Sequence, residues 1–254
     1  MQNPFTPFIL LSATSLLLLS CGPKTPDTAD LKFYEIAYSD TAIRVDGELN
    51  EAVWKTVPAV DDFQFPWWTA GKKEKTKAKL LWDDHYLYVS FVCEDAHIWA
   101  EHTERDSPVY KDDCVEVFLS PNPDQLEDYF NIEMNAQGVS LDFQHPEGPG
   151  SKIPWDPKLG IATTIDGTLN DDSDTDNLWT LEAAIPFSAF SHVAKNTPPQ
   201  PGDEWRLNLH RLGGQTNPQH SQWNPAVSKK VLFHAPQFFG RVTFVKELSE
   251  AEAP

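Results

Sequence analysis

Alternation of apolar and polar residues with a period of two is the main pattern along this chain. It is clear in the segments 86–93, 114–119, 130–135, 141–143, 179–185 and 205–210. Successive side chains of a strand point to opposite faces, so each segment predicts a strand with one apolar and one polar face. Turn residues separate these segments, and no long amphipathic helix pattern occurs. The sequence predicts an all-β fold, a two-sheet antiparallel β-sandwich, jelly-roll-like, with short helical turns. One such turn is expected near Trp54, with Asn50 as its cap.

The first twenty residues form an uncharged leader with an apolar run at 8–19, the length of a signal-peptide core. The run ends at Leu18-Leu19-Ser20-Cys21, which resembles a bacterial lipobox whose cysteine is lipidated. No Lys or Arg precedes the run, so a cleaved signal with a chance cysteine stays open. We expect a signal peptide at 1–20, lipidated Cys21 and a tether at 21–32, one domain at 33–248 and a disordered tail at 249–254. Both alternatives predict export, and lipidation predicts a protein anchored to the bacterial cell envelope, at the outer membrane or cell surface.

The charge balance narrows the classes of partner. The chain has 38 acidic and 20 basic residues, a formal net charge of -18. This excess of carboxylates repels phosphate backbones and anionic headgroups. We therefore expect no nucleic-acid partner, contact with a membrane only through the lipid anchor, and a monomer that binds neutral ligands or metal cations.

Two cysteines remain besides Cys21. Cys93 and Cys114 both lie in strand-like runs. An exported compartment permits a disulfide between them, whereas two separate buried thiols are the simpler interpretation, which we favour.

Polar residues share one face of the predicted strands. By parity this set is Glu116, Asn131, Glu133, Asp142, Glu182, Arg206, Asn208 and His210. Planar polar groups of these kinds can bind vicinal sugar hydroxyls. The pattern alone favours instead the solvated outer face that antiparallel sandwiches usually have.

Two aromatic residues lie in polar, turn-rich surroundings. Tyr110 lies between Val109 and Lys111, and Trp223 lies in Ser221-Gln222-Trp223-Asn224-Pro225. Two aromatic rings that face each other can hold a sugar by its C–H faces. We expect both rings to be exposed at one groove. Of Trp67 and Trp68, which are adjacent, at most one can face the same ligand.

Four segments carry a resemblance to a known family. Residues 45–51 with Trp54, and the segments 112–118, 179–187 and 234–240, resemble the family 9 carbohydrate-binding modules and their stand-alone relatives. The resemblance runs from about residue 38 to residue 245. It implies a β-sandwich that binds a poly- or oligosaccharide, since the best-known members hold the ends of cellulose or xylan chains between two Trp rings.

The resemblance also implies site residues. The two platform rings fall on Tyr110 and Trp223, and a hydroxyl-binding acid falls on Glu116. An arginine that binds sugar in the family falls on Asn131, and Arg206 on a neighbouring strand could replace it.

Calcium is a further feature of the family. Acidic residues crowd the loop before Trp179, and Asp172, Asp174 and Asp176 are the expected ligands of a Ca²⁺ ion. The glycine and terminal glutamate of an EF-hand loop are not at the required offsets. The sequence therefore favours a solvated acidic hairpin over a bound ion at these residues.

These features favour a non-catalytic, carbohydrate-binding lipoprotein that supports carbohydrate catabolism. A glycoside hydrolase is the first rival, since Glu116 with Glu133 or Glu182 could supply the two required carboxylates. A ligand-free structural envelope protein is the second, and it predicts that Tyr110 and Trp223 are packed rather than exposed.

Overall fold

The computed structural model describes residues 26–249 and is built from strands and short 3-10 turns. The strands are β1 Phe33–Tyr38, β2 Thr76–Trp82, β3 Tyr86–Glu94, β4 Cys114–Ser120, β5 Tyr129–Asn135, β6 Ser140–His145, β7 Ile153–Pro154, β8 Gly160–Asp166, β9 Leu178–Pro186, β10 Glu204–Gly213, β11 Gln219–Gln222 and β12 Gly240–Val245. The 3-10 turns are η1 Thr28–Asp30, η2 Ala52–Lys55, η3 Val109–Lys111, η4 Phe187–Phe190 and η5 Pro236–Phe238. Among these residues no helix has the length and apolar character needed to span a membrane.

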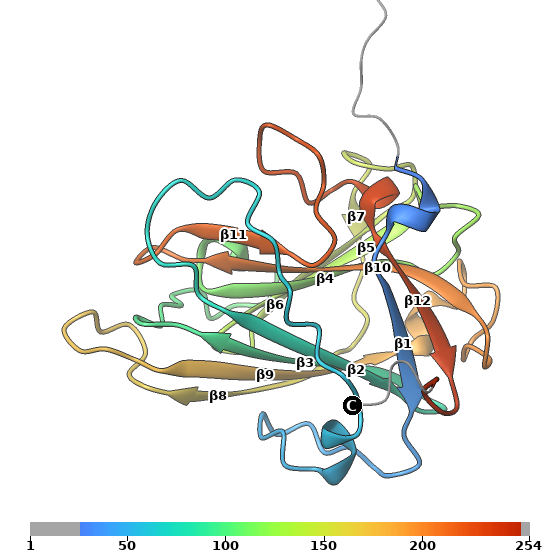
Figure 1. Cartoon of the computed structure of the whole chain (residues 1–254), viewed down its shortest axis with the longest axis horizontal. Helices are drawn as coiled ribbons and strands as arrows, with labels where there is room; N and C mark the ends of the chain where they lie inside the picture. The colour runs from blue at the N-terminus through green and yellow to red at the C-terminus, as the bar shows by residue number, and fades with distance from the viewer. Residues whose placement is uncertain (1–25, 250–254) are drawn as a thin grey trace, which may run out of the picture.

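The strands form two layers that are joined at one end (Figure 1). One layer has the order β7-β6-β5-β4-β10, with β11 also paired to β10, and the other has the order β2-β3-β9-β8. β12 and β1 connect β10 to β2, so hydrogen bonds run continuously through one curled sheet. β1 is parallel to both of its neighbours, and every other pairing of named strands is antiparallel. The prediction of an all-β sandwich is confirmed, and the parallel connection through β1 is an addition to it.

The space between the layers is filled by the apolar residues of the alternating pattern. Val115, Val117 and Leu119 of β4 are fully buried there, as are Leu181 and Ile185 of β9. Burial of such side chains contributes about 1.5–3 kcal/mol each, so this shared core holds the layers together. All six segments predicted from the period of two lie in strands, which explains why the pattern was a reliable signal.

The polar face of the predicted strands is covered instead of solvated. Phe118, Tyr129, Phe233 and Phe239 belong to a second apolar cluster on the outside of the β4–β5–β10 layer. Six of the eight polar residues grouped by parity share this outer face and are buried beneath the cluster and the surrounding loops: Glu116, Asn131, Glu133, Arg206, Asn208 and His210. Asp142 pairs with Ile132 and projects from the opposite face, and Glu182 lies on β9 in the other layer, although both are buried as well. The expectation of a solvated outer face was therefore wrong, because loops from distant parts of the sequence fold over it.

The two cysteines are buried free thiols, as favoured above. Cys93 belongs to the core between the layers, whereas Cys114 belongs to the outer cluster. Burial raises the pKa of Cys93 to about 12, so this thiol stays protonated and unreactive.

Glu182 fixes the segment that opens the domain. Its carboxylate accepts hydrogen bonds from the backbone N–H groups of Asp46 and Gly47 and from Nε1 of Trp54, at 3.0–3.1 Å. Gly47 has φ +82, and a Cβ there would lie 2.7 Å from the backbone of Thr163, so only glycine fits. The turn η2 follows with Glu51 as its N-cap, so the expected cap at Asn50 was wrong.

Replacement of Glu182 by alanine should strongly destabilise the fold. Three buried donors would lose their acceptor, and we expect the free energy of unfolding to fall by about 3 kcal/mol. Urea denaturation measures this change. The matched control is Glu48→Ala, which removes an exposed carboxyl from the same loop and should change the unfolding free energy by less than about 0.5 kcal/mol. Equal losses in the two variants would contradict the anchoring role.

Candidate functional site

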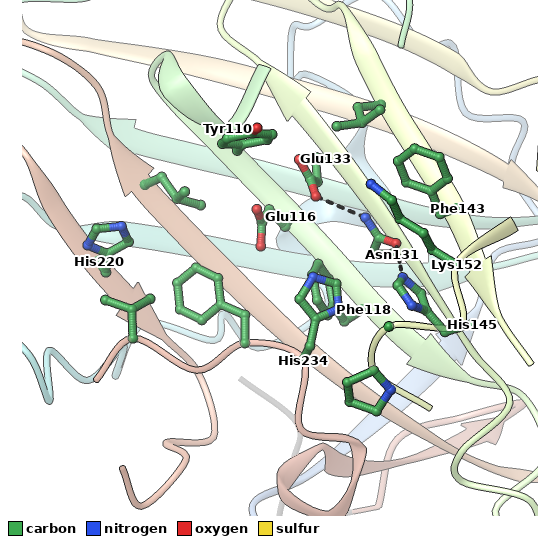
Figure 2. Close-up of a pocket in the computed structure, with 16 residues that line it drawn as sticks. Tyr110, Glu116, Phe118, Asn131, Glu133, Phe143, His145, Lys152, His220 and His234 are labelled. Carbon is green, nitrogen blue, oxygen red and sulfur yellow. Dashed lines mark hydrogen bonds between the residues drawn. The ribbon is translucent and has the colours of Figure 1, made fainter. Parts of the chain in front are cut away.

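A cavity of about 430 Å³ opens on the outer face of the β4–β5–β6 region (Figure 2). Its floor follows a single row of the sheet, in which Glu116 of β4, Glu133 of β5 and Leu141 of β6 are directly paired in turn. His210 of β10 continues this row but is buried beneath Phe233 and does not line the cavity. Directly opposed residues of antiparallel strands project to the same face. The register therefore brings Glu116 and Glu133 together at the centre of the floor.

Loops and strand ends supply the walls of the cavity. Tyr110 comes from η3, Lys152 from the segment before β7, and Val231, Phe233 and His234 from the segment before η5. The other lining residues are Phe118, Asn131, Phe143, His145, Pro149, Gly150, Leu212 and His220. The site thus combines a polar floor with largely apolar and aromatic walls, the composition typical of small-molecule pockets.

Tyr110 is held at the rim of the cavity by its buried neighbours. Val109 is fully buried in the outer cluster, whereas the Tyr110 side chain is 46% exposed. Asp113 fastens the following segment by accepting hydrogen bonds from the N–H groups of Trp99 and Gly214. These contacts fix the short η3 turn, so the open ring is presented on a rigid support.

Glu116 and Glu133 form a buried pair of acids on the floor. Their exposed fractions are 2% and 6%, and each has an Oε2 atom that makes no hydrogen bond within the described residues. Nδ1 of His210 lies 3.2 Å from Oε2 of Glu116, but the two atoms are not aligned for a hydrogen bond. Burial raises the pKa of Glu133 to about 7. Burial and the Glu133 carboxylate raise the pKa of Glu116 well above its usual value.

Asn131 connects this pair to a histidine. Its Nδ2 donates to Oε1 of Glu133 at 2.9 Å, and its Oδ1 accepts from Nε2 of His145 at 2.8 Å. Burial lowers the pKa of His145 to about 4, so the ring is neutral with its proton on Nε2. Nδ1 of His145 is buried and has no partner in residues 26–249. Asn131 is thereby fixed in one orientation, with its amide unable to rotate freely.

Three of the five predicted ligand-binding residues meet in this cavity. Tyr110, Glu116 and Asn131 all line it, and Figure 2 shows them around the floor and rim. Trp223 and Arg206 do not line it.

The exposed ring expected at Trp223 was wrong. Its side chain is only 4% exposed and packs in the core between the layers, against Gly240. Polar residues around it misled the sequence argument because they are themselves buried. Gln222 pairs with the backbone of Gln64, and Asn224 accepts from the N–H of Lys32. The two-ring sandwich formed by Tyr110 and Trp223 is therefore not present.

Arg206 has a structural role in place of the expected ligand contact. Its Nε donates to the carbonyl of Phe239 at 2.9 Å, and its Nη2 also donates to the carbonyl of Gln237. Both carbonyls lie at the end of η5 or just before β12. The guanidinium thus holds the closing loop and is buried away from the cavity.

Several site residues were missed by the sequence argument. Glu133 was grouped by parity and considered as a hydrolase carboxylate, but it was not among the five predicted ligand-binding residues, although its position opposite Glu116 follows once the β4–β5 register is known. His145 shares the parity of Phe143 on β6, and both line the cavity. Lys152, Phe233 and His234 lie in loops, where no periodic signal indicates which cavity a side chain enters.

The aspartates proposed for calcium do not form an ion site. Both carboxylate oxygens of Asp176 accept backbone hydrogen bonds, from Ile98 and Thr168, at 2.6–2.7 Å. Asp174 accepts from the hydroxyl of Thr168. Throughout residues 26–249 no group of three or more His, Cys, Asp or Glu side chains is arranged to hold a metal ion. The residues therefore do not fit the calcium site that the resemblance implied.

Solved structures share this fold. A protein of Bacteroides uniformis aligns with a TM-score of 0.70 at 19% identity, over 84% of this chain and 99% of its own. A family 9 carbohydrate-binding module of Caldicellulosiruptor kristjanssonii, solved with cellotriose, aligns with a TM-score of 0.61 at 18% identity, over 88% and 98% of the two chains. The same kind of module from that organism, solved with glucose, gives a TM-score of 0.58 at 18% identity, over 86% and 98%.

Curated relatives match over shorter stretches. Exoglucanase XynX of Acetivibrio thermocellus is 26% identical over 148 residues, which is 58% of this chain and 12% of the relative. Endo-1,4-beta-xylanase C of Paenibacillus barcinonensis is 30% identical over 100 residues, 39% of this chain and 8% of the relative. The matched part of this chain thus spans about a tenth of each relative's length.

A family model shows to which protein family the chain belongs. The carbohydrate family 9 binding domain-like model matches residues 45–247, which include the cavity and both layers of the sheet. The match extends over far more than half of the chain, and the chain therefore belongs to the carbohydrate family 9 binding domain-like family.

Proposed function

We propose that this protein is a non-catalytic carbohydrate-binding lipoprotein that holds a sugar unit of a poly- or oligosaccharide in the cavity beside Tyr110. The observation that carries the proposal is the exposed Tyr110 ring at the rim of a pocket whose floor contains buried, unpaired polar atoms. Such a ring can cover the C–H face of a pyranose, and the polar atoms can bind its hydroxyls.

The volume of the cavity and the ligands bound in structurally similar modules support this proposal. A cavity of about 430 Å³ lies in the range typical of small-molecule pockets. Structurally similar modules were solved with cellotriose and with glucose. Uncharged glucans and xylans are accordingly the first ligands to test.

The arrangement of the acids favours binding over hydrolysis. A glycoside hydrolase needs two carboxyl groups that flank the scissile bond. Glu116 and Glu133 lie side by side on neighbouring strands of one floor (Figure 2). Glu182, the other candidate partner, lies on β9 and is occupied by the turn at Gly47. Neither combination supports the hydrolase alternative.

Replacement of Tyr110 by alanine should weaken glycan binding by about tenfold or more, because the stacking surface is lost. The stability of the fold should change by less than about 1 kcal/mol, since the ring is largely exposed. A glycan array on the chain from Gly22 onward selects the ligand, and isothermal titration calorimetry then measures the affinity of both proteins.

The matched control is Tyr86→Ala, which removes another exposed tyrosine from the start of β3, outside this cavity. It should bind the glycan like the unchanged protein. Equal affinities of the Tyr110 variant and the unchanged protein would contradict the proposed site, and an array without any signal would contradict the proposed function.

Attachment to the envelope is the second part of the proposal. Cys21 lies outside the described residues, and the lipobox-like sequence that ends at this residue supports the proposal that it is lipidated. The relatives that are xylanases and an exoglucanase support a role in carbohydrate catabolism, with this protein capturing glycans for separate enzymes. The anchor would place the binding site at the bacterial outer membrane or cell surface.

The variant Cys21→Ser should remove the lipid and release the protein from membranes. A single thiol carries the anchor, so we expect the variant in the soluble fraction and the unchanged protein in the detergent-extracted membrane fraction. Fractionation followed by mass spectrometry of the N-terminal peptide measures both effects. An unchanged membrane fraction in the variant would refute lipidation at this residue.

A further inference from the structure

The acid pair on the cavity floor has no cationic partner. Among residues 26–249, no Lys or Arg forms an ion pair with Glu116 or Glu133. Oε2 of each acid is buried without a hydrogen bond. Other buried acids of this chain are fully engaged, as in the contacts of Asp113 with Arg211 and two backbone N–H groups. The pair at the floor is thus an exception within its own structure.

Such a pair keeps at least one proton near neutral pH. Two buried carboxylates that are neighbours in the sheet cannot both ionise without a large electrostatic cost. A protonated carboxyl donates a hydrogen bond and an ionised one accepts, so together they match the donor and acceptor of a hydroxyl group. The pair therefore offers an uncharged sugar both kinds of contact at one point.

We propose that Glu133 is a ligand-binding residue and that it acts with Glu116 as one coupled acid pair, which binds a hydroxyl group of an uncharged glycan. This inference rests on the proposed function. It adds a binding residue to the site and predicts how ligand affinity depends on pH.

The surroundings of the pair determine which groups titrate with it. His210 of β10, His145 of β6 and His234 of the closing loop face the floor, and burial lowers the pKa of each of them. The pKa of His220 on β11 is lowered by the same cause.

The other ionisable groups near the pair are a lysine, an aspartate and a cysteine. Lys152 is the cation at the wall of the cavity, with its Nζ 4.5 Å from the centre of the Phe143 ring. Asp142 on β6 has a pKa near 6 and is paired with Arg105, and Cys114 is a buried neutral thiol. The acid pair is therefore the main group of the floor that titrates near pH 7.

The direction of the pH effect follows from water exclusion. A bound sugar displaces water from the floor and so favours the protonated pair still further. The complex then holds its proton more tightly than the free protein, and affinity must fall as pH rises through about 7. From pH 6 to pH 8.5 we expect a loss of about tenfold.

Titration calorimetry with cellotriose, at pH 6 and pH 8.5, tests this inference. Glu133→Gln keeps the size and a donor and acceptor but removes one of the two titrating carboxyls, so its loss of affinity over this range should be clearly smaller than that of the unchanged protein. The control is Glu147→Gln, which replaces an exposed carboxyl five residues before Lys152 in the sequence. It should retain the full pH dependence of the unchanged protein. In the unchanged protein, buffers of different ionisation enthalpy should reveal proton uptake on binding at pH 7.5.

Stability provides a check that the variant folds. Because the native state binds protons at Glu133 more tightly than the unfolded chain does, its stability falls as pH rises from about 4.5 to about 7. The Glu133→Gln variant should therefore melt at a higher temperature than the unchanged protein at pH 8.5.

Two results would overturn the inference. The first is that the affinity of the unchanged protein stays constant or rises between pH 6 and pH 8.5. The second is that the Glu133→Gln variant keeps the full pH dependence of the unchanged protein. If cellotriose binds in a Tyr110-dependent manner in either case, only the acid pair is refuted. Absence of binding at every pH, for cellotriose and for every glycan of the array, would instead refute the proposed function and this inference together.

Discussion

The register between β4 and β5 is the constraint on which the site depends. It places Glu116 directly opposite Glu133, and the next pairing places Phe118 opposite Asn131. A shift of β4 by one residue would turn Glu116 into the core between the layers and expose Val115 and Val117. The large cost of burying that acid among apolar side chains and exposing the valines excludes this alternative. The same alternation that builds the core thus sets the chemistry of the cavity floor.

Acids elsewhere in the chain show what structural carboxylates look like in this fold. Glu182 accepts three hydrogen bonds at the turn that opens the domain. Asp112 accepts from backbone N–H groups of Glu101 and His102 and from the amide of Asn135. These groups are buried because they connect loops to strands. Glu116 and Glu133 do not connect a loop to a strand in this way, and their unpaired oxygens lie at a cavity. This is the pattern expected where a ligand completes the hydrogen bonding.

The sequence predicted the strands well because each needs only local information. The alternation in 114–119 and 179–185 is a direct consequence of one apolar face packing on a core. Exposure of the other face could not be predicted, because the loops that cover Glu133 and His210 come from distant segments. Trp223 illustrates the same limit, since Ser221 and Gln222 are polar yet buried by pairing with the chain near Gln64. Tyr110 was predicted correctly as exposed, because the short turn around it buries Val109 instead.

A single open ring changes how this site must obtain its affinity. Phe233, on another wall, is nearly buried and stacks on His210, with the ring centres 4.1 Å apart, so one of its faces is already occupied. Stacking on Tyr110 alone supplies less apolar contact than two facing rings would. The remaining binding energy must come from the floor, where leaving a buried polar atom unpaired costs about 1–3 kcal/mol. Affinity that depends on such atoms discriminates between hydroxyl patterns more strongly than aromatic stacking does. Under the proposed function we therefore expect the floor, and not the rim, to determine which sugar is selected.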